Sequence, residues 1–242
     1  MLVGRPHVPG AESSPRARGP LWRAALAAAA LAVGLTLWGT LGAAPPVGPF
    51  VTVTAVGCGG RANASGFAVA DDLVVTAAHP VAGRRQVVVT DSAGRSRHGF
   101  VVALDPNLDV AAVRVPGLAA APVVLGVGDA ASLAPPGSVG VVAAVPEDGE
   151  QVAKPARVTR RIRAHIDDIY LAGRVSRRAL ELSFDGAYGD SGAAVLNSDG
   201  AVVGMVFATS RHREDVGYAV RSVEVRSVLS QLADLPQRSA CP

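Results

Sequence analysis

Three short patterns in the chain carry side chains that together could perform acyl transfer. Ser191 lies in the sequence Gly-Asp-Ser-Gly, Asp109 begins an apolar run, and His79 follows the small residues Ala77 and Ala78. A serine hydroxyl is a weak nucleophile and needs a base to take its proton. An imidazole is such a base, and a carboxylate bonded to its other nitrogen fixes the tautomer that faces the serine. The pattern therefore predicts nucleophilic catalysis by Ser191, His79 and Asp109.

The residues around Ser191 suit a nucleophile. Gly189 and Gly192 permit a tight turn that lifts the hydroxyl out of the chain. Such a turn also lets the backbone N–H groups of Gly189 and Ser191 converge on one point, where they would stabilise the oxyanion of a tetrahedral intermediate. The alternative is a glycine-rich hairpin with an ordinary surface serine.

Asp109 and His79 stand in apolar surroundings. Asp109 heads the run 109–115, and a carboxylate among residues destined for burial needs a partner, such as a histidine ring N–H. One of the five histidines lies in the leader. Of the four in the exported part, only His79 has small apolar neighbours; the other three lie near arginines, namely His98, His165 and His212. The alternatives are an aspartate that caps a turn and a structural histidine.

The elements that must position these residues are predicted to be strands. The chain has 27 glycines and many valines, a composition that favours strands joined by tight turns. Two sets of about six runs indicate paired antiparallel barrels or a sandwich. The connection 117–137 separates them, and the helical spacing of apolar residues in 223–235 predicts a short helix. The expected strands are 51–56, 66–70, 73–76, 86–90, 99–104 and 109–115, then 139–145, 156–162, 175–184, 192–197, 201–208 and 216–220.

The order His–Asp–Ser identifies a family. The sequences TAAH (76–79), LDVAAV (108–113) and GDSG (189–192) resemble the active-site signatures of trypsin-like serine proteases, over about residues 51–220. The resemblance implies an all-β, chymotrypsin-like fold of two antiparallel six-stranded β-barrels, at about 51–116 and 138–220, with a C-terminal helix at about 223–235. It implies a serine endopeptidase with its triad between the barrels and a protein or peptide substrate.

One branch of the family is more similar. The matching segments are GCGG (57–60), GF (66–67), PARV (155–158), DIY (168–170) and GYAV (217–220), which resemble the mycobacterial acid-resistance periplasmic serine protease and its relatives. This resemblance implies a role in envelope stress or acid tolerance. The membrane part of that branch has several helices, whereas this sequence has room for one.

The N-terminal part predicts a membrane tether. Residues 1–23 carry four arginines and one glutamate, which matches the formal net charge of +3 of the whole chain. Residues 24–44 carry no charge and are long enough to cross a bilayer, and arginines before such a run stay in the cytoplasm. The expected organisation is a cytoplasmic leader (1–23), a transmembrane anchor (24–44), a linker (45–50) and a protease domain (51–242) on the periplasmic side of a bacterial membrane.

A cleaved signal peptide is the alternative for this segment. Its apolar region would span only about 7–15 residues and would end at a small-residue cleavage site. Here the run is longer, and Pro45 and Pro46 follow directly after the small residues. The part of the chain beyond the leader is neutral, so no nucleic-acid partner is expected, and the sequence predicts neither a cofactor nor a metal.

Cys58 and Cys241 lie near the two ends of the exported part. In an oxidising exterior they could form one disulfide, and the family resemblance supports this pairing. The alternative is a pair of free thiols, one of them on the C-terminal tail. The sequence contains no Cys-x-x-Cys redox motif.

Three features leave the activity open. Digestive relatives pair the residue equivalent to Asp190 with a newly formed N-terminus, which this chain does not show, so Asp190 needs another partner or its loop is ordered only conditionally. Asp185 stands where trypsin-like enzymes select basic side chains, but the cysteines that frame that pocket are missing. Ala193 and Ala194 replace the family's common Gly-Pro. An inactive fold that serves as a binding or redox-sensing module is therefore the alternative function.

Overall fold

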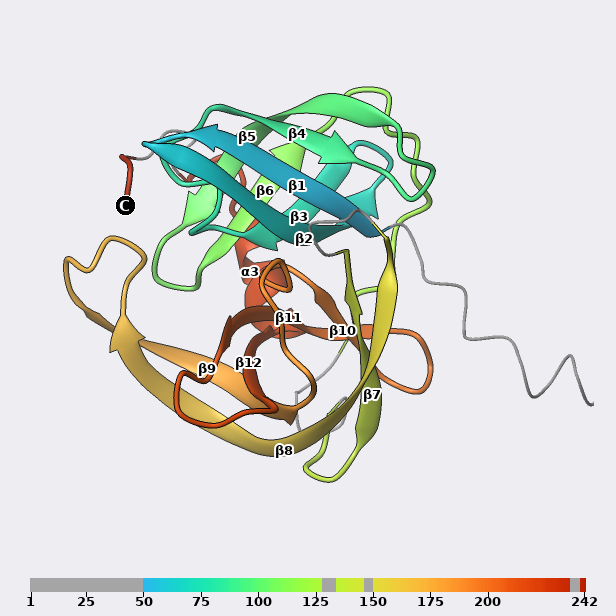
Figure 1. Ribbon diagram of the computed structural model, residues 1–242, viewed down its shortest axis with the longest axis vertical. Helices are drawn as coiled ribbons and strands as arrows, with labels where there is room; N and C mark the ends of the chain where they lie inside the picture. Colours follow the sequence, from blue (N-terminus) through green and yellow to red (C-terminus); the bar gives the residue numbers. More distant parts are fainter. Residues whose placement is uncertain (1–49, 128–133, 146–149, 236–239) are drawn as a thin grey trace, which may run out of the picture. The chain divides into compact units, whose positions relative to one another are not determined.

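The computed structural model describes residues 50–127, 134–145, 150–235 and 240–242. All of them lie in the compact unit from Pro45 to Pro242. Their strands form two closed six-stranded barrels, which Figure 1 shows one above the other. The all-β, two-barrel prediction is confirmed.

The first barrel consists of six antiparallel strands in the order β1-β2-β3-β6-β5-β4. Pairing of β1 with β4, with Val53 opposite Val89, closes it. Its interior is packed with small branched side chains such as Val74 and Val113, both fully buried. The strands are β1 (Phe50–Gly57), β2 (Gly60–Ala70), β3 (Leu73–Ala77), β4 (Gln86–Thr90), β5 (Ser96–Asp105) and β6 (Val110–Arg114).

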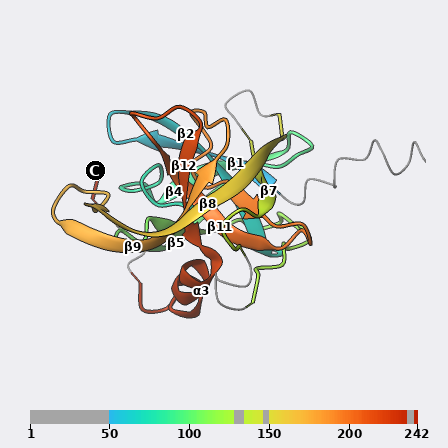
Figure 2. The same ribbon diagram turned by 90° about the horizontal axis from the view of Figure 1, so that it is seen from below.

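The second barrel repeats this arrangement in the order β10-β11-β12-β9-β8-β7. Pairing of β10 with β7, with Val195 opposite Val142, closes it. The hairpin of β8 and β9 is longer than expected, and Ile169 and Tyr170 at its tip pack against the core of the first barrel. Figure 2 shows this hairpin reaching out from the barrel. The strands are β7 (Val139–Ala144), β8 (Val152–Asp167), β9 (Arg174–Ser183), β10 (Ala194–Leu196), β11 (Val202–Thr209) and β12 (Val216–Arg221).

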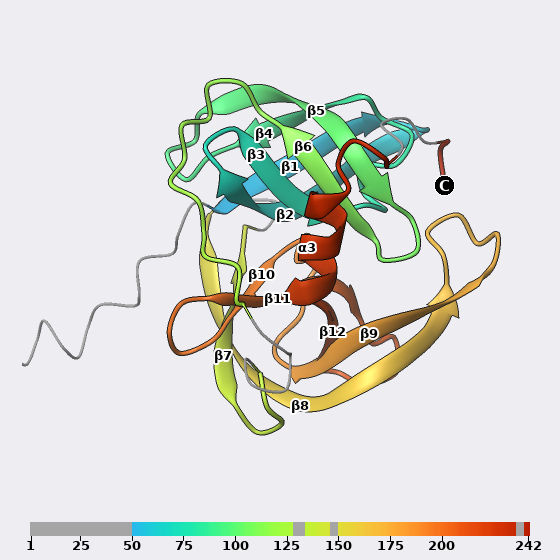
Figure 3. The ribbon, with the colours of Figure 1, turned by 180° about the vertical axis from the view of Figure 1, so that it is seen from behind.

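The helix α3 (Ser222–Ser230) follows β12 directly and ends earlier than the predicted 223–235. Val225 and Val228 are buried in a cluster that also contains Val75 and Val110 of the first barrel. The helix therefore packs against both barrels, and Figure 3 shows it where they meet. Arg226 fastens it further by donating hydrogen bonds to the carbonyl oxygens of the connection at positions 125 and 126, at 2.6 and 3.0 Å.

The predicted membrane part falls outside the described residues. The leader 1–23, the anchor 24–44 and all of the linker except its last residue are in this undescribed part. Phe50, expected at the end of the linker, instead begins β1 and is buried. Within the described residues, no helix is long and apolar enough to cross a membrane.

The expected disulfide is present. Cys58, in the turn between β1 and β2, is bonded to Cys241, 183 residues away in the sequence. Neither cysteine is a free thiol. Gly83 lies against this bridge so closely that a Cβ there would be 2.5 Å from the Cys58 sulfur. The bridge therefore ties the C-terminal segment to the first barrel.

Candidate active site

His79 and Asp109 are in direct contact beside the ends of β3 and β6. The ring Nδ1 of His79 lies 2.9 Å from Oδ2 of Asp109, and the backbone N–H of His79 donates to Oδ1 at 2.8 Å. Asp109 is buried, so both oxygens need these partners. The contact holds the imidazole by one nitrogen and leaves the other for a reaction partner.

The backbone at Asp109 is unusual. Its φ is +60°, in the left-handed region that non-glycine residues seldom adopt. Such a conformation costs about 1–3 kcal/mol and persists only where surrounding contacts enforce it. Here one contact is the hydrogen bond from the N–H of Ala78 to the carbonyl of Asp109, at 3.2 Å. In this conformation the carboxylate faces His79, and β6 begins at the next residue, Val110.

Arg177 on β9 is a member of the site that the sequence analysis did not identify. Its guanidinium is almost completely buried, with Nη1 3.6 Å from Oδ2 of Asp109. It donates to the carbonyl oxygens of Pro106 and Asn107 and stacks over the ring of Phe207 at 5.1 Å. Burial lowers the pKa of Arg177 despite the opposing attraction of Asp109. The cation is therefore costly to bury, and it braces the loop that carries the carboxylate of Asp109.

Ser191 and His79 line one cleft. The cleft has a volume of about 730 Å³ and brings residues from both barrels together, including Arg84 of the first and Arg211 of the second. Within the described part of the chain, neither Ser191 Oγ nor the second ring nitrogen of His79 forms a hydrogen bond. Catalytic hydrogen bonds are commonly long or misaligned without substrate, so the shared cleft is the relevant observation.

Within the described residues, three N–H groups of the loop 187–192 have no acceptor, those of Tyr188, Gly189 and Ser191. The other contacts of the loop include Asp190 N to Ala187 O at 3.2 Å, Gly192 N to Val206 O at 2.8 Å and Ala193 N to Asp190 O at 2.9 Å. The N–H groups of Gly189 and Ser191 are the two donors expected to hold an oxyanion.

Glycine is required at position 192. Its φ is +88°, and a Cβ there would lie 2.0 Å from the carbonyl oxygen of Ser65 and 2.6 Å from Thr76 Oγ1. No side chain fits that space. Ala193, in contrast, is fully buried in the core of the second barrel and keeps its backbone hydrogen bonds. The alanine that replaces the family glycine therefore does not displace the nucleophile loop.

Ser65 on β2 links the nucleophile loop to both barrels. Its N–H donates to the carbonyl of Ser191 at 2.9 Å, and its hydroxyl donates to the carbonyl of Gly189 at 2.8 Å. The same hydroxyl accepts a hydrogen bond from Val145 N, at 2.9 Å. No sequence signal marks this fully buried serine, because its partners are remote along the chain.

Asp190 has an internal partner. Lys154 Nζ on β8 lies 2.7 Å from Asp190 Oδ2, and the N–H of Ala187 donates to the same oxygen at 2.7 Å. The side chains are 14% and 1% exposed. The sequence analysis left this partner open. The one available signal was that Lys154 is the only lysine in a chain rich in arginine.

Asp185 does not join the site. It is exposed and is not among the residues that line the cleft. The preceding Phe184 is buried, and its ring lies so close to Gly217 that a Cβ there would be 2.1 Å from Cε1. The space in front of Gly217 is thus filled by an aromatic ring. A basic side chain bound in the cleft would therefore not meet a buried carboxylate at this position.

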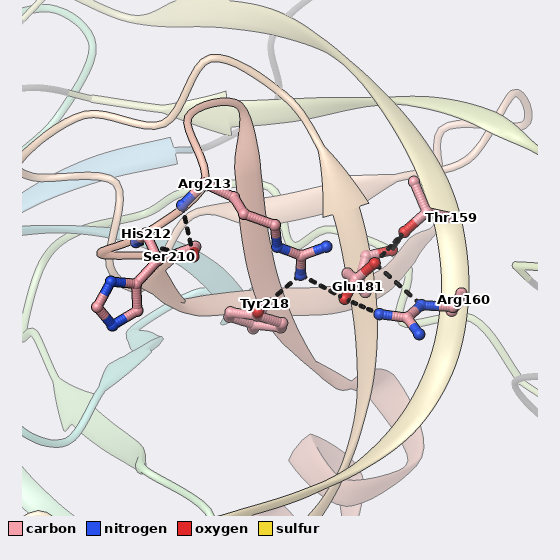
Figure 4. Close-up of polar contacts among 7 residues, drawn as sticks. All are labelled: Thr159, Arg160, Glu181, Ser210, His212, Arg213 and Tyr218. Carbon is pink, nitrogen blue, oxygen red and sulfur yellow. Dashed lines mark hydrogen bonds and ion pairs between the residues drawn. The ribbon is translucent and has the colours of Figure 1, made fainter.

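A second charged cluster ties the loop 210–215, which carries the cleft residue Arg211, to β8 and β9. Figure 4 shows Glu181 of β9 between Arg160 of β8 and Arg213 of the loop that also carries Arg211. The contacts are 2.6 Å to Arg160 Nη2 and 2.9 Å to Arg213 Nη2, with a further hydrogen bond from Thr159. Hydrogen bonds from Arg160, more than any other contact, lower the pKa of Glu181 to about 2. The carboxylate therefore stays charged in moderately acidic solution.

The described residues contain no cluster of three or more histidine, cysteine, aspartate or glutamate side chains that could hold a metal ion.

Comparisons with known proteins point to one family. A profile of the trypsin-like peptidase domain matches residues 64–205. Among curated proteins, the chain is similar to the serine proteases Rv3671c and MT3772 from two strains of Mycobacterium tuberculosis. It is 34% identical to each over 169 residues, which is 69% of this chain and 41% of the relative. The chain therefore matches about two fifths of the length of these relatives.

Solved structures show the same relationship. The active form of the Rv3671c protease from M. tuberculosis superimposes with a TM-score of 0.74 and 30% identity, covering 81% of this chain and 88% of that chain. An inactive form of the same protease gives 0.66, with 76% and 88% covered. A serine endoprotease from Yersinia pestis, at 18% identity, 76% and 62% coverage and a TM-score of 0.62, shares the fold.

Proposed function

Because the chain belongs to the trypsin-like peptidase family, we propose that it is a serine endopeptidase whose catalytic triad is His79, Asp109 and Ser191. The observation that carries this proposal is the His79 ring held against a buried carboxylate in the same cleft as Ser191. The similarity to an active protease form supports it.

The reaction follows from this arrangement. Ser191 Oγ attacks the carbonyl carbon of the scissile peptide bond, and its proton passes to Nε2 of His79. The negative charge that develops on the carbonyl oxygen is stabilised by the N–H groups of Gly189 and Ser191. His79 then protonates the leaving amine as the C–N bond breaks. Water, activated by His79, releases the acyl group from Ser191.

We expect no preference for a basic side chain before the scissile bond. The segments 187–191 and 206–209 form the cleft walls beside Ser191. Asp185 is exposed outside the cleft and does not supply a charge for a basic side chain.

The proposed setting is the extracytoplasmic face of a bacterial membrane. The arginine-rich leader followed by the uncharged run 24–44 supports a single-pass tether with the protease domain outside. The disulfide between Cys58 and Cys241 supports an oxidising compartment. Envelope proteins or peptides are the proposed substrates. A role in stress or acid tolerance agrees with the ion pairs of Glu181, whose lowered pKa keeps them charged in acid.

Labelling with a fluorescent fluorophosphonate tests the proposal. The wild-type protein is expected to become labelled on Ser191, and Ser191→Ala is expected to remain unlabelled. His79→Ala should lose labelling while it keeps the circular dichroism spectrum of the wild type. A folded wild type that stays unlabelled would contradict the proposal and favour the alternative, a binding or redox-sensing module.

A further inference from the structure

Asp190 is a buried charge beside the nucleophile that takes no part in the chemical steps above. Its side chain is 1% exposed. Oδ1 has no hydrogen-bond partner in the described part of the chain. Oδ2 accepts from the backbone N–H of Ala187 and from Lys154 Nζ, each at 2.7 Å. Since the backbone N–H has no formal charge, Lys154 is the one cation among the described residues that pairs with this carboxylate.

Lys154 brings this charge from a rigid element. It lies on β8 opposite Val142 of β7, and it is 36 residues from Asp190 in the sequence. Its side chain is only 14% exposed, so the ammonium group is held on the interior side of the strand. A lysine ammonium is a compact charge with three donors, which suits a carboxylate oxygen that is approached from one direction.

The position of Asp190 gives the pair its importance. Asp190 lies between Gly189 and Ser191, whose N–H groups are the proposed oxyanion donors. A buried carboxylate that loses its cation is strongly unfavourable and turns toward water where the chain allows. Rotating the backbone at position 190 would move the peptide group that carries the Ser191 N–H relative to the N–H of Gly189, so the two donors would no longer converge on one point.

We infer that Lys154 is a positioning residue that holds the oxyanion donors in their active arrangement through Asp190. This inference rests on the proposed peptidase function. It implies that the folded chain completes its own oxyanion site, because the required cation comes from β8 and not from a newly formed chain end. Lys154 touches no reacting atom, so its effect on the reaction passes entirely through the loop 187–192.

The kinetic signature follows from where the donors act. They contact the tetrahedral oxyanion more strongly than the bound substrate, so misplacing them lowers kcat and leaves KM almost unchanged. Removal of a single oxyanion donor typically lowers kcat by about 10²–10³-fold. We expect Lys154→Met to lower kcat by about this factor, with KM within about threefold of the wild type. Lys154→Arg keeps the charge and should recover activity to within about tenfold.

The experiment uses the full-length protein in detergent and a fluorogenic peptide. Arg163→Met is the matched control, because it removes an exposed positive charge from the same strand; its kcat should equal that of the wild type. Hydrogen exchange of the peptide covering 185–192 is measured in parallel. Exchange there should rise in Lys154→Met and not in the control, while the other barrel strands stay protected. Wild-type kcat in Lys154→Met would overturn the inference.

Two further arms keep the result decisive. If Lys154→Met does not fold, the double variant with Asp190→Asn removes the uncompensated charge together with its partner. A folded but slow double variant supports the inference, and one as fast as the wild type overturns it. If the wild type itself is unreactive, the proposed peptidase function fails. Hydrogen exchange then still decides, because unchanged exchange of 185–192 in Lys154→Met would exclude the positioning role.

Discussion

Replacing Glu181 by glutamine tests whether the ion pairs of Glu181 with Arg160 and Arg213 stabilise the fold as the pH falls. The substitution keeps the shape of the side chain and the hydrogen bond with Thr159, but it removes the charge shared with Arg160 and Arg213. The folded protein lowers the pKa of Glu181 from its ordinary 4.5 to about 2. A carboxyl group whose pKa is lowered by folding stabilises the fold at pH values above its pKa in the unfolded chain. This contribution is lost as the pH falls toward its pKa in the folded protein.

The magnitude follows from the shift and from solvent exposure. A change of this size corresponds to at most about 3 kcal/mol. The side chains of Arg160 and Arg213 are 63% and 49% exposed, so solvent screening reduces the contribution to about 1–2 kcal/mol. Glu181→Gln should therefore lower the free energy of unfolding by about 1–2 kcal/mol at pH 7. The difference should shrink between about pH 4.5 and pH 2.

Urea unfolding followed by circular dichroism at pH 7, 5, 3.5 and 2.5 measures this difference. Asp199→Asn is the control, because it makes the same charge change at an exposed turn. If Glu181→Gln and the wild type differ by the same free energy at pH 7 and 2.5, the ion pairs do not act as described. Equal stability at pH 7 would refute the reasoning as well.

Three other substitutions test separate parts of the site. Arg177→Met should lower the free energy of unfolding by about 3 kcal/mol and slow fluorophosphonate labelling at least about tenfold, because it leaves Asp109 without its buried cation; Arg178→Met, at an exposed position of the same strand, should not slow labelling. Cys58→Ser should lower the thermal midpoint, since opening a loop of 183 residues removes up to about 5 kcal/mol on the chain-entropy model; reductant should lower the wild type equally, and equal midpoints without reductant would contradict this. Gly192→Ala should abolish labelling, because its Cβ would clash with a carbonyl oxygen; rapid labelling of that variant would be incompatible with the loop geometry.

The two barrels were predictable because short valine-rich runs, separated by turn residues, recur along the sequence. The start of β2 was missed, since Gly60–Ala70 begins with small and polar residues whose strand conformation comes from pairing with β1, as between Val56 and Arg61. The length of β8 was also missed. Its outer half carries exposed arginines and has its conformation fixed by β9. Strand pairing, which sequence patterns express only weakly, decided both boundaries.

The candidate triad came from residue type and order, but its supporting residues did not. Arg177 lies in an arginine-rich stretch that is typical of a solvated surface. It is two residues from both Val175 and Ala179, however, so it shares their inner face of β9. Ser65 and Gly189 are 124 residues apart, and no local pattern joins them. Groups that act only after distant strands are in register leave no signature in a single sequence. Asp185, chosen by its distance from Ser191, is exposed and does not line the cleft.

Through the Ser65 hydroxyl, the position of the loop 187–192 depends on how the two barrels pack against each other. This hydroxyl contacts Gly189 and Val145 from one barrel while its own strand belongs to the other. A tilt or slide between the halves must therefore break a buried polar contact at the loop before much surface is exposed. The proposed peptidase activity should be lost at a lower temperature or denaturant concentration than the one that unfolds the barrels. Inhibitors that separate the two barrels should block the reaction without contacting Ser191.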